Sequence, residues 1–254
     1  IVYEPKAETG EMKVDLERAQ LGYAFGGLTA WAGRFQTPLG YWNTLSGHGG
    51  EEQLTILRPR FLDFSDRGGV MPVRTVGIWA HGAEHVGEAG KFIYDLFATN
   101  GARITGYDST TSPATLGSLD DNLSKSDSSG LFGGALAFDF EQPGLSGLRL
   151  GVHAVGGTVR AYSSSTYAAS SSTENVRTML TGGYLFYDNE SVRILGEFYN
   201  YLNADITDPL ATVEHKSWAY LALVSYDFGK YVPYLMFEKS NLDFSDPYFF
   251  SQAN

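Results

Sequence analysis

Arginines and carboxylates alternate with apolar residues along several stretches of this chain. The arginines are Arg18, Arg34, Arg149, Arg177 and Arg193, and the carboxylates are Asp95, Asp139, Glu141, Glu197 and Asp227. If each set of alternating positions forms one face of a strand, these ionisable groups share a face. Burying a bare charge in a dry core costs many kcal/mol, so these groups require either water or one another. Their chemistry is therefore electrostatic, and an enclosed wet space or a closed one with paired charges would accommodate them.

The longest connection between apolar stretches, residues 37–72, holds a second group of functional side chains. Aromatic and basic residues stand there among several glycines, and the candidates are Tyr41, Trp42, His48, Arg58 and Arg60. A connection of this length without structure of its own is usually functional. Two alternatives remain open, because the segment either folds inward and narrows the enclosed space or packs on its neighbours outside.

Patterns typical of metal sites and hydrolases are weak in this sequence. His81 and His85 stand four residues apart, but the order of an HExxH motif is missing and a strand would separate them. Ser46 and His48 lack a nucleophile elbow, and Asp139 and Glu141 have no recognisable acid–base pocket around them. Four aspartates, Asp108, Asp120, Asp121 and Asp127, are expected to be solvated loop residues rather than calcium ligands. We expect no metal, no cofactor and no enzymatic activity.

Composition narrows the class of protein. The 254 residues carry a formal net charge of −11, which disfavours nucleic-acid binding, and cysteine is absent, which excludes disulfides and thiolate chemistry. Glycine (30), tyrosine (16) and phenylalanine (16) are abundant. No run approaches the roughly 18 apolar residues of a transmembrane helix. These features favour an all-β protein.

Alternation with a period of two predicts ten strands. They cover 14–26, 28–36, 73–82, 91–99, 130–141, 147–161, 175–187, 192–202, 215–228 and 231–239. Short connections alternate with long ones along the chain. Successive connections of an up-and-down meander lie at opposite ends of the sheet. One end therefore carries short turns and the other long loops, as in outer-membrane barrels.

Aromatic pairs indicate which solvent lies outside the sheet. Four strands end in aromatic-x-aromatic beside a short turn, namely Tyr23/Phe25, Phe138/Phe140, Tyr184/Phe186 and Tyr226/Phe228. Aromatic side chains collect at membrane–water boundaries, so the pairs predict a lipid-facing girdle. The apolar face then points outward, and the arginines and carboxylates line the lumen.

One third of the chain, residues 17–101, resembles a known family. The matching residues are Glu17-Arg18-Ala19, GRFQTPLGYWN at 33–43, LRPRF at 57–61, Gly68-Gly69 with Pro72, Val76-Gly77, Tyr94-Asp95-Leu96 and Asn100-Gly101. They are similar to a proteobacterial outer-membrane porin family in the style of the phosphate-selective porins. The resemblance implies a channel in the outer membrane and further strands upstream of Ile1. The phosphate-binding lysine cluster of those porins has no counterpart here, so phosphate selectivity is not implied.

The sequence therefore predicts one all-β domain over residues 1–254, an antiparallel up-and-down transmembrane β-barrel of a Gram-negative outer membrane. The last expected strand ends near Lys239 and should be followed by another, so we expect part of a barrel of about 12–16 strands, with strands missing at both ends. The expected function is a porin for passive diffusion of small polar solutes or ions. The expected partners are these solutes, outer-membrane lipid and lipopolysaccharide, and a homo-oligomer such as a trimer is compatible. The alternatives are a structural barrel that sheathes or anchors a partner protein, a lipid-modifying enzyme of the outer membrane, and a soluble β-sandwich.

Overall fold

The structure is a computed structural model. It describes residues 2–5, 12–15, 18–46, 55, 58–63, 71–100, 103–105, 118–120, 130–162, 172–206, 212–243, 245–246 and 248–249.

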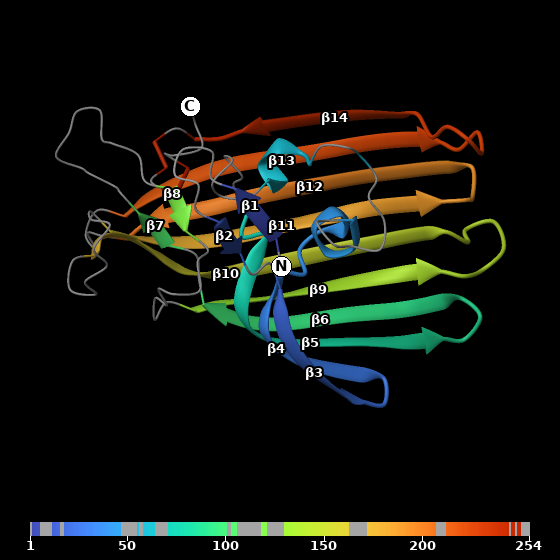
Figure 1. Ribbon diagram of the computed structural model, residues 1–254, viewed down its shortest axis with the longest axis horizontal. Coiled ribbons are helices and arrows are strands. Elements are labelled where there is room, and N and C mark those ends of the chain that lie inside the picture. The colour runs from blue at the N-terminus through green and yellow to red at the C-terminus, as the bar shows by residue number, and fades with distance from the viewer. Residues whose placement is uncertain are drawn as a thin grey trace.

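Ten strands form one antiparallel up-and-down sheet in which each strand pairs with the next (Figure 1). They are β3 (Ala19–Phe25), β4 (Leu28–Gln36), β5 (Arg74–Val86), β6 (Gly90–Asn100), β9 (Gly130–Phe140), β10 (Leu148–Tyr162), β11 (Ser172–Asp188), β12 (Val192–Asp205), β13 (Val213–Tyr226) and β14 (Tyr234–Asn241). The predicted all-β meander is confirmed, with all ten expected strands present. Within the described part of the chain, β3 pairs with β4 alone and β14 with β13 alone.

Four short strands and two helical turns complete the described structure. The strands β1 (Val2–Pro5) and β2 (Met12–Asp15) pair with each other. The strand β7 (Arg103–Thr105) pairs with both β8 (Ser118–Asp120) and β10. The helical turns are η1 (Trp42–Ser46), a π-helix, and η2 (Arg60–Leu62), a 3₁₀-helix. These short elements fall below the length at which alternation predicts a strand.

The tight turns gather at one end of the sheet, on the right of Figure 1, and the long connections at the other. At this turn end the chain uses left-handed backbone, with φ of 61° at Gly26 and 83° at Gly229. Such φ values suit glycine because it has no Cβ, so the hairpins can be short.

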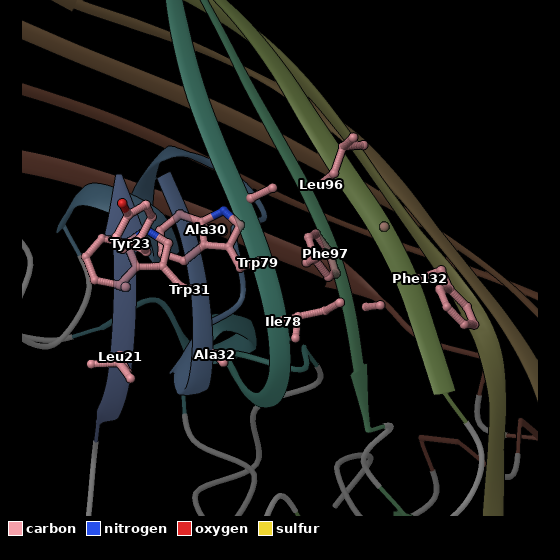
Figure 2. Close-up of a pocket in the computed structure, with 14 residues that line it drawn as sticks. Leu21, Tyr23, Ala30, Trp31, Ala32, Ile78, Trp79, Leu96, Phe97 and Phe132 are labelled. Atoms are coloured by element: carbon pink, nitrogen blue, oxygen red, sulfur yellow. The ribbon is translucent and has the colours of Figure 1, made fainter. Parts of the chain in front are cut away.

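Large apolar side chains on the outer face are exposed. Among them are Leu21 (82 % exposed), Leu235 (71 %) and Phe132 (66 %). At the β3 end, Leu21, Tyr23, Ile78, Leu96 and Phe132 help to line an apolar hollow of about 740 Å³, to which five strands contribute (Figure 2). A soluble surface rarely exposes a continuous apolar area of this kind.

Three of the four predicted aromatic pairs belong to this outer face, but the pair on β11 does not. Phe186 is buried, and Tyr184 and Phe186 both contact Tyr41 on the inner side of the sheet. Alternation therefore places Arg177 on the outer face of β11, where it is exposed. The prediction that Arg177 faces the lumen is wrong. The apolar set of β11 faces inward because another segment of the chain covers it.

Arg34 is predicted to line the lumen. It pairs with Val76 along the ladder and precedes Phe35, which packs on Trp79 inside the sheet. The preceding Gly33 has φ of 132°, which interrupts the regular alternation. The Arg34 side chain is buried, unlike the exposed outward residues Ala32 and Ile78. Alternation alone therefore does not define the face of Arg34.

Candidate functional site on the inner face of the sheet

Charged side chains form a row across the inner face near the turn end. The register aligns Lys91 on β6 with Asp139 on β9 and Arg149 on β10. The Arg149 guanidinium donates to Asp139 through Nε and through Nη2, the latter at 2.6 Å, and Lys91 Nζ lies 3.9 Å from the same carboxylate. A bidentate arginine–carboxylate pair of this kind fixes both side chains in place.

A second polar cluster stands further from the turns, on β5 and β6. Asp95 Oδ1 accepts a hydrogen bond from Trp79 Nε1 at 2.8 Å and lies 2.8 Å from His81 Nδ1. Asp95 is buried, whereas 42 % of the His81 side chain is exposed. The imidazole therefore presents a polar edge to the space inside the sheet.

Small side chains separate these polar groups. Ala135 pairs with both Asp95 and His153, and Gly133 and Ala137 flank it on the same face of β9. Ala135 and Gly133 are partly exposed. We call the inner face of β5, β6, β9 and the turn end of β10 the charged wall.

The inner face of β11, β12 and β13 differs, because two described parts of the long segment, residues 37–46 and 58–63, pack on it. In Figure 1 the two helical turns of this segment lie over the sheet. Tyr41 stacks on Phe186 with ring centroids 3.8 Å apart, and the Phe61 ring lies 5.3 Å from that of Tyr199. Trp42 is 1 % exposed. We call this part of the inner face the covered wall.

Glu197 on β12 anchors the segment. Its carboxylate accepts a hydrogen bond from the backbone N–H of Trp42 at 2.5 Å and another from the Tyr199 hydroxyl at 2.5 Å. Its side chain is buried, so these donors supply the hydrogen bonds that water would otherwise give. Glu197 is predicted to line the lumen. Instead, its carboxylate binds the backbone N–H of Trp42 and is not available to solutes.

Gly40 brings the segment close enough to reach this anchor. Its backbone has φ of 73°, and its N–H donates to His153 Nδ1 at 3.2 Å. A Cβ at this position would collide with the Tyr199 hydroxyl and lie 3.0 Å from Glu197 Oε2. Only glycine fits both the backbone conformation and the space.

A second segment, after β14, also packs on the covered wall near the long connections. Asp246 accepts from Asn203 Nδ2 at 2.8 Å, and Phe249 packs on Tyr201. Burial raises the pKa of Asp246 above its ordinary range. In contrast, hydrogen bonds from Ser245 lower the pKa of the partly exposed Asp243.

Ser245, His215 and Asp243 lie together but do not form a catalytic relay. Ser245 Oγ (3.3 Å) and Asp243 Oδ2 (3.1 Å) both approach His215 Nδ1. A hydrolytic triad needs the serine and the carboxylate on opposite ring nitrogens, so that one orients the base while the other is activated.

The remaining predicted residues lie at the ends of strands or in the long segment. Arg193 pairs with Asp188 at 2.6 Å, and Glu141 and Asp227 are exposed at the turn end. Arg18 is exposed just before β3. Of the segment candidates, Arg58 donates to Leu62 O, and the backbone N–H of Arg60 donates to Glu238 Oε2 at 2.7 Å. His48 lies outside the described residues.

Sequence reasoning missed the partners of the segment, which are His153, Tyr184, Phe186 and Tyr199. Each is more than 100 residues along the chain from the segment residue that it contacts, as the separation of 113 between Gly40 and His153 illustrates. The glycine-rich composition around Gly40 was the only local signal.

Comparisons with protein-family models, curated proteins and solved structures give no match to this chain. In the described part of the chain, no helix is long and apolar enough to cross a membrane. The described residues also contain no group of three or more histidines and acids placed to hold a metal ion.

Proposed function

We propose that this protein is an outer-membrane porin that lets small polar solutes or ions diffuse passively. The observation that carries the proposal is the contrast between the two faces of the sheet. Exposed apolar side chains such as Leu21, Phe132 and Leu235 stand outside, and paired ions such as Asp139 and Arg149 stand inside. Lipid outside and water inside satisfy both faces, as in transmembrane β-barrels.

The pathway follows the charged wall. Lys91, Asp139 and Arg149 keep 34 %, 20 % and 22 % of their side chains exposed, and the neighbouring alanines and glycines leave room beside them. The segment anchored on Glu197 borders this pathway, because the Arg149 guanidinium lies 5.7 Å from the centre of the Tyr41 ring, and the segment narrows the passage there. Size exclusion and the field of the charged wall then determine which solutes pass.

The alternative of a barrel that sheathes a partner protein is less well supported. Sheathing requires an inner face that is free to contact the partner. Here the chain's own residues already cover β11, β12 and β13, where Leu195 and Tyr199 are fully buried. A passage for small solutes needs only the charged wall.

Planar-bilayer recording tests the proposal. Addition of the detergent-purified protein should produce stepwise conductance increases, and polyethylene glycols small enough to enter should lower each step. Heat-denatured protein is the control. A protein that remains dispersed without detergent and produces no steps would contradict the proposal.

A further inference from the structure

The outer face of β10–β13 changes character towards the long connections. From Met179 to Tyr187, the outward side chains of β11 are uncharged, and those of β12 carry no charge over its whole length. At about 3.3 Å per residue this stretch of β11 is about 26 Å long, and a tilt of about 40° reduces its height to about 20 Å. The uncharged band thus has nearly the height of the apolar band of outer-membrane barrels, about 25 Å.

Charged side chains begin in the last row of this band, where Lys216 pairs with Leu202 and Leu202 with Met179. Alternation places Arg160, Arg177, Glu214 and Lys216 on the outer face, all in the rows nearest the long connections. Arg177, Glu214 and Lys216 are exposed. Three cations against one carboxylate is a local positive excess in a chain whose net charge is −11.

A hollow of about 580 Å³ lies among these residues. The small residues Gly156 and Ala204 help to line it, together with Met179 and Leu202, which are 47 % and 43 % exposed. Arg177 and Lys216 also line it. The hollow therefore places apolar side chains, which continue the uncharged band, next to cations on the side of the long connections.

We propose that this hollow binds the phosphate-bearing headgroup of a membrane lipid. Arg177 and Lys216 contact the phosphate, and an acyl chain lies along Met179 and Leu202. Guanidinium and ammonium groups form charge-assisted hydrogen bonds with phosphate oxygens, which are strong beside an apolar surface. Glu214, which also lines the hollow, accepts from a hydroxyl or ammonium group of the same headgroup. The proposal rests on the membrane location in the proposed function.

Lipid retention in detergent tests the site. Wild-type protein and a double variant, Arg177→Gln with Lys216→Gln, are titrated with diphosphorylated lipid A, and bound lipid is counted by native mass spectrometry. We expect the double variant to bind at least tenfold more weakly. Lys230→Gln, which removes a cation at the turn end of the sheet, is the matched control and should bind like the wild type. Equal binding by the double variant and the wild type would overturn the proposal.

Two further arms identify the ligand. Dephosphorylated lipid A should bind at least tenfold more weakly than the diphosphorylated form, and equal binding would overturn the phosphate contact. Inorganic phosphate should not displace the lipid at millimolar concentration. Displacement would assign the site to a free anion and overturn the lipid proposal.

Bilayer recordings separate this proposal from the proposed function. The double variant should keep the conductance of the wild type, which also shows that it folds. A wild type that binds lipid A in this manner but forms no channel would contradict the porin proposal and leave the lipid site supported. A wild type that conducts but binds lipid A no better than the double variant would support the porin proposal and contradict the lipid site.

Discussion

One row of inward side chains runs from β6 to β13 near the turn end, and its two halves differ. On β6, β9 and β10 it consists of Lys91, Asp139 and Arg149, whereas on β11, β12 and β13 it consists of Phe186, Leu195 and Leu223. The charged half keeps part of its surface exposed, whereas the apolar half is buried, with Phe186 stacked against Tyr41 of the long segment. In this row, the side chains are charged where part of their surface stays exposed and apolar where they are buried. Polar groups buried elsewhere on the covered wall, such as Glu197 and Asn203, have hydrogen-bond partners within the protein.

The largest effect is expected from removing the core of the covered wall. Trp42→Ala should lower the free energy of unfolding in detergent by about 3–5 kcal/mol, because Trp42 is buried and its removal leaves a cavity. Trp218→Ala, on the outer face, is the matched control and should cost clearly less. Urea titration followed by tryptophan fluorescence measures both. Equal losses would show that Trp42 and its described neighbours in the segment do not form a core with the sheet.

Gly40→Ala should detach the segment more selectively. The strained backbone and the collision with Tyr199 should cost about 1–3 kcal/mol of unfolding free energy and widen the passage, so single-channel conductance should rise. Gly229→Ala has a similar φ of 83° but free space around the new Cβ, so it reports backbone strain alone. If conductance is unchanged in Gly40→Ala, or rises equally in both variants, the segment does not narrow the passage.

Charge reversal on the charged wall should change ion preference with little effect on folding. Arg149→Glu places a second carboxylate beside Asp139, so the reversal potential in a salt gradient should shift towards cation selectivity. Arg177→Glu makes the same change on the outer face and should leave the reversal potential unchanged. If Arg149→Glu leaves the reversal potential at the wild-type value, the charged wall does not line the path.

The smallest effect is expected at Asp246, on the second segment of the covered wall. Burial raises its pKa above the ordinary value of 3.8, so the folded state binds its proton more tightly than the unfolded state. Its contribution to stability is full below the unfolded pKa and is lost as the pH rises through the folded pKa. Asp246→Asn should remove this decline, an effect of about 1 kcal/mol or less, which melting curves between about pH 3.5 and pH 7 would detect.

The neighbouring Asp243 changes stability in the opposite direction, because its lowered pKa favours the folded state above the unfolded pKa and this gain is lost as the pH falls. Both the wild type and Asp246→Asn keep Asp243, so the difference between their curves reports Asp246 together with its interaction with Asp243. Parallel curves for the two proteins would show that Asp246 does not titrate as described.

The ten strands could be predicted because alternation and short turns are local signals. Which face of β11 points inward could not be predicted. Alternation separates apolar from polar side chains, but it does not show whether the apolar ones contact lipid or a protein core. Tyr184 and Phe186 therefore look like girdle residues in the sequence, and Arg177 looks like a lumen residue. The contacts of Gly40 and Trp42 with His153 and Glu197 depend on register across several strands, which no local pattern contains.

The absence of cysteine permits a direct test of the two faces and the two walls. Single cysteines are placed at Ala135 on the charged wall, Ala219 on the covered wall and Val152 on the outer face, and the proteins are reconstituted in lipid vesicles. A charged, membrane-impermeant thiol reagent should label Ala135→Cys rapidly and the other two slowly, whereas a lipid-soluble maleimide should label Val152→Cys. Labelling of Val152→Cys by the charged reagent as fast as Ala135→Cys would contradict the assignment of lipid to the outer face and water to the charged wall.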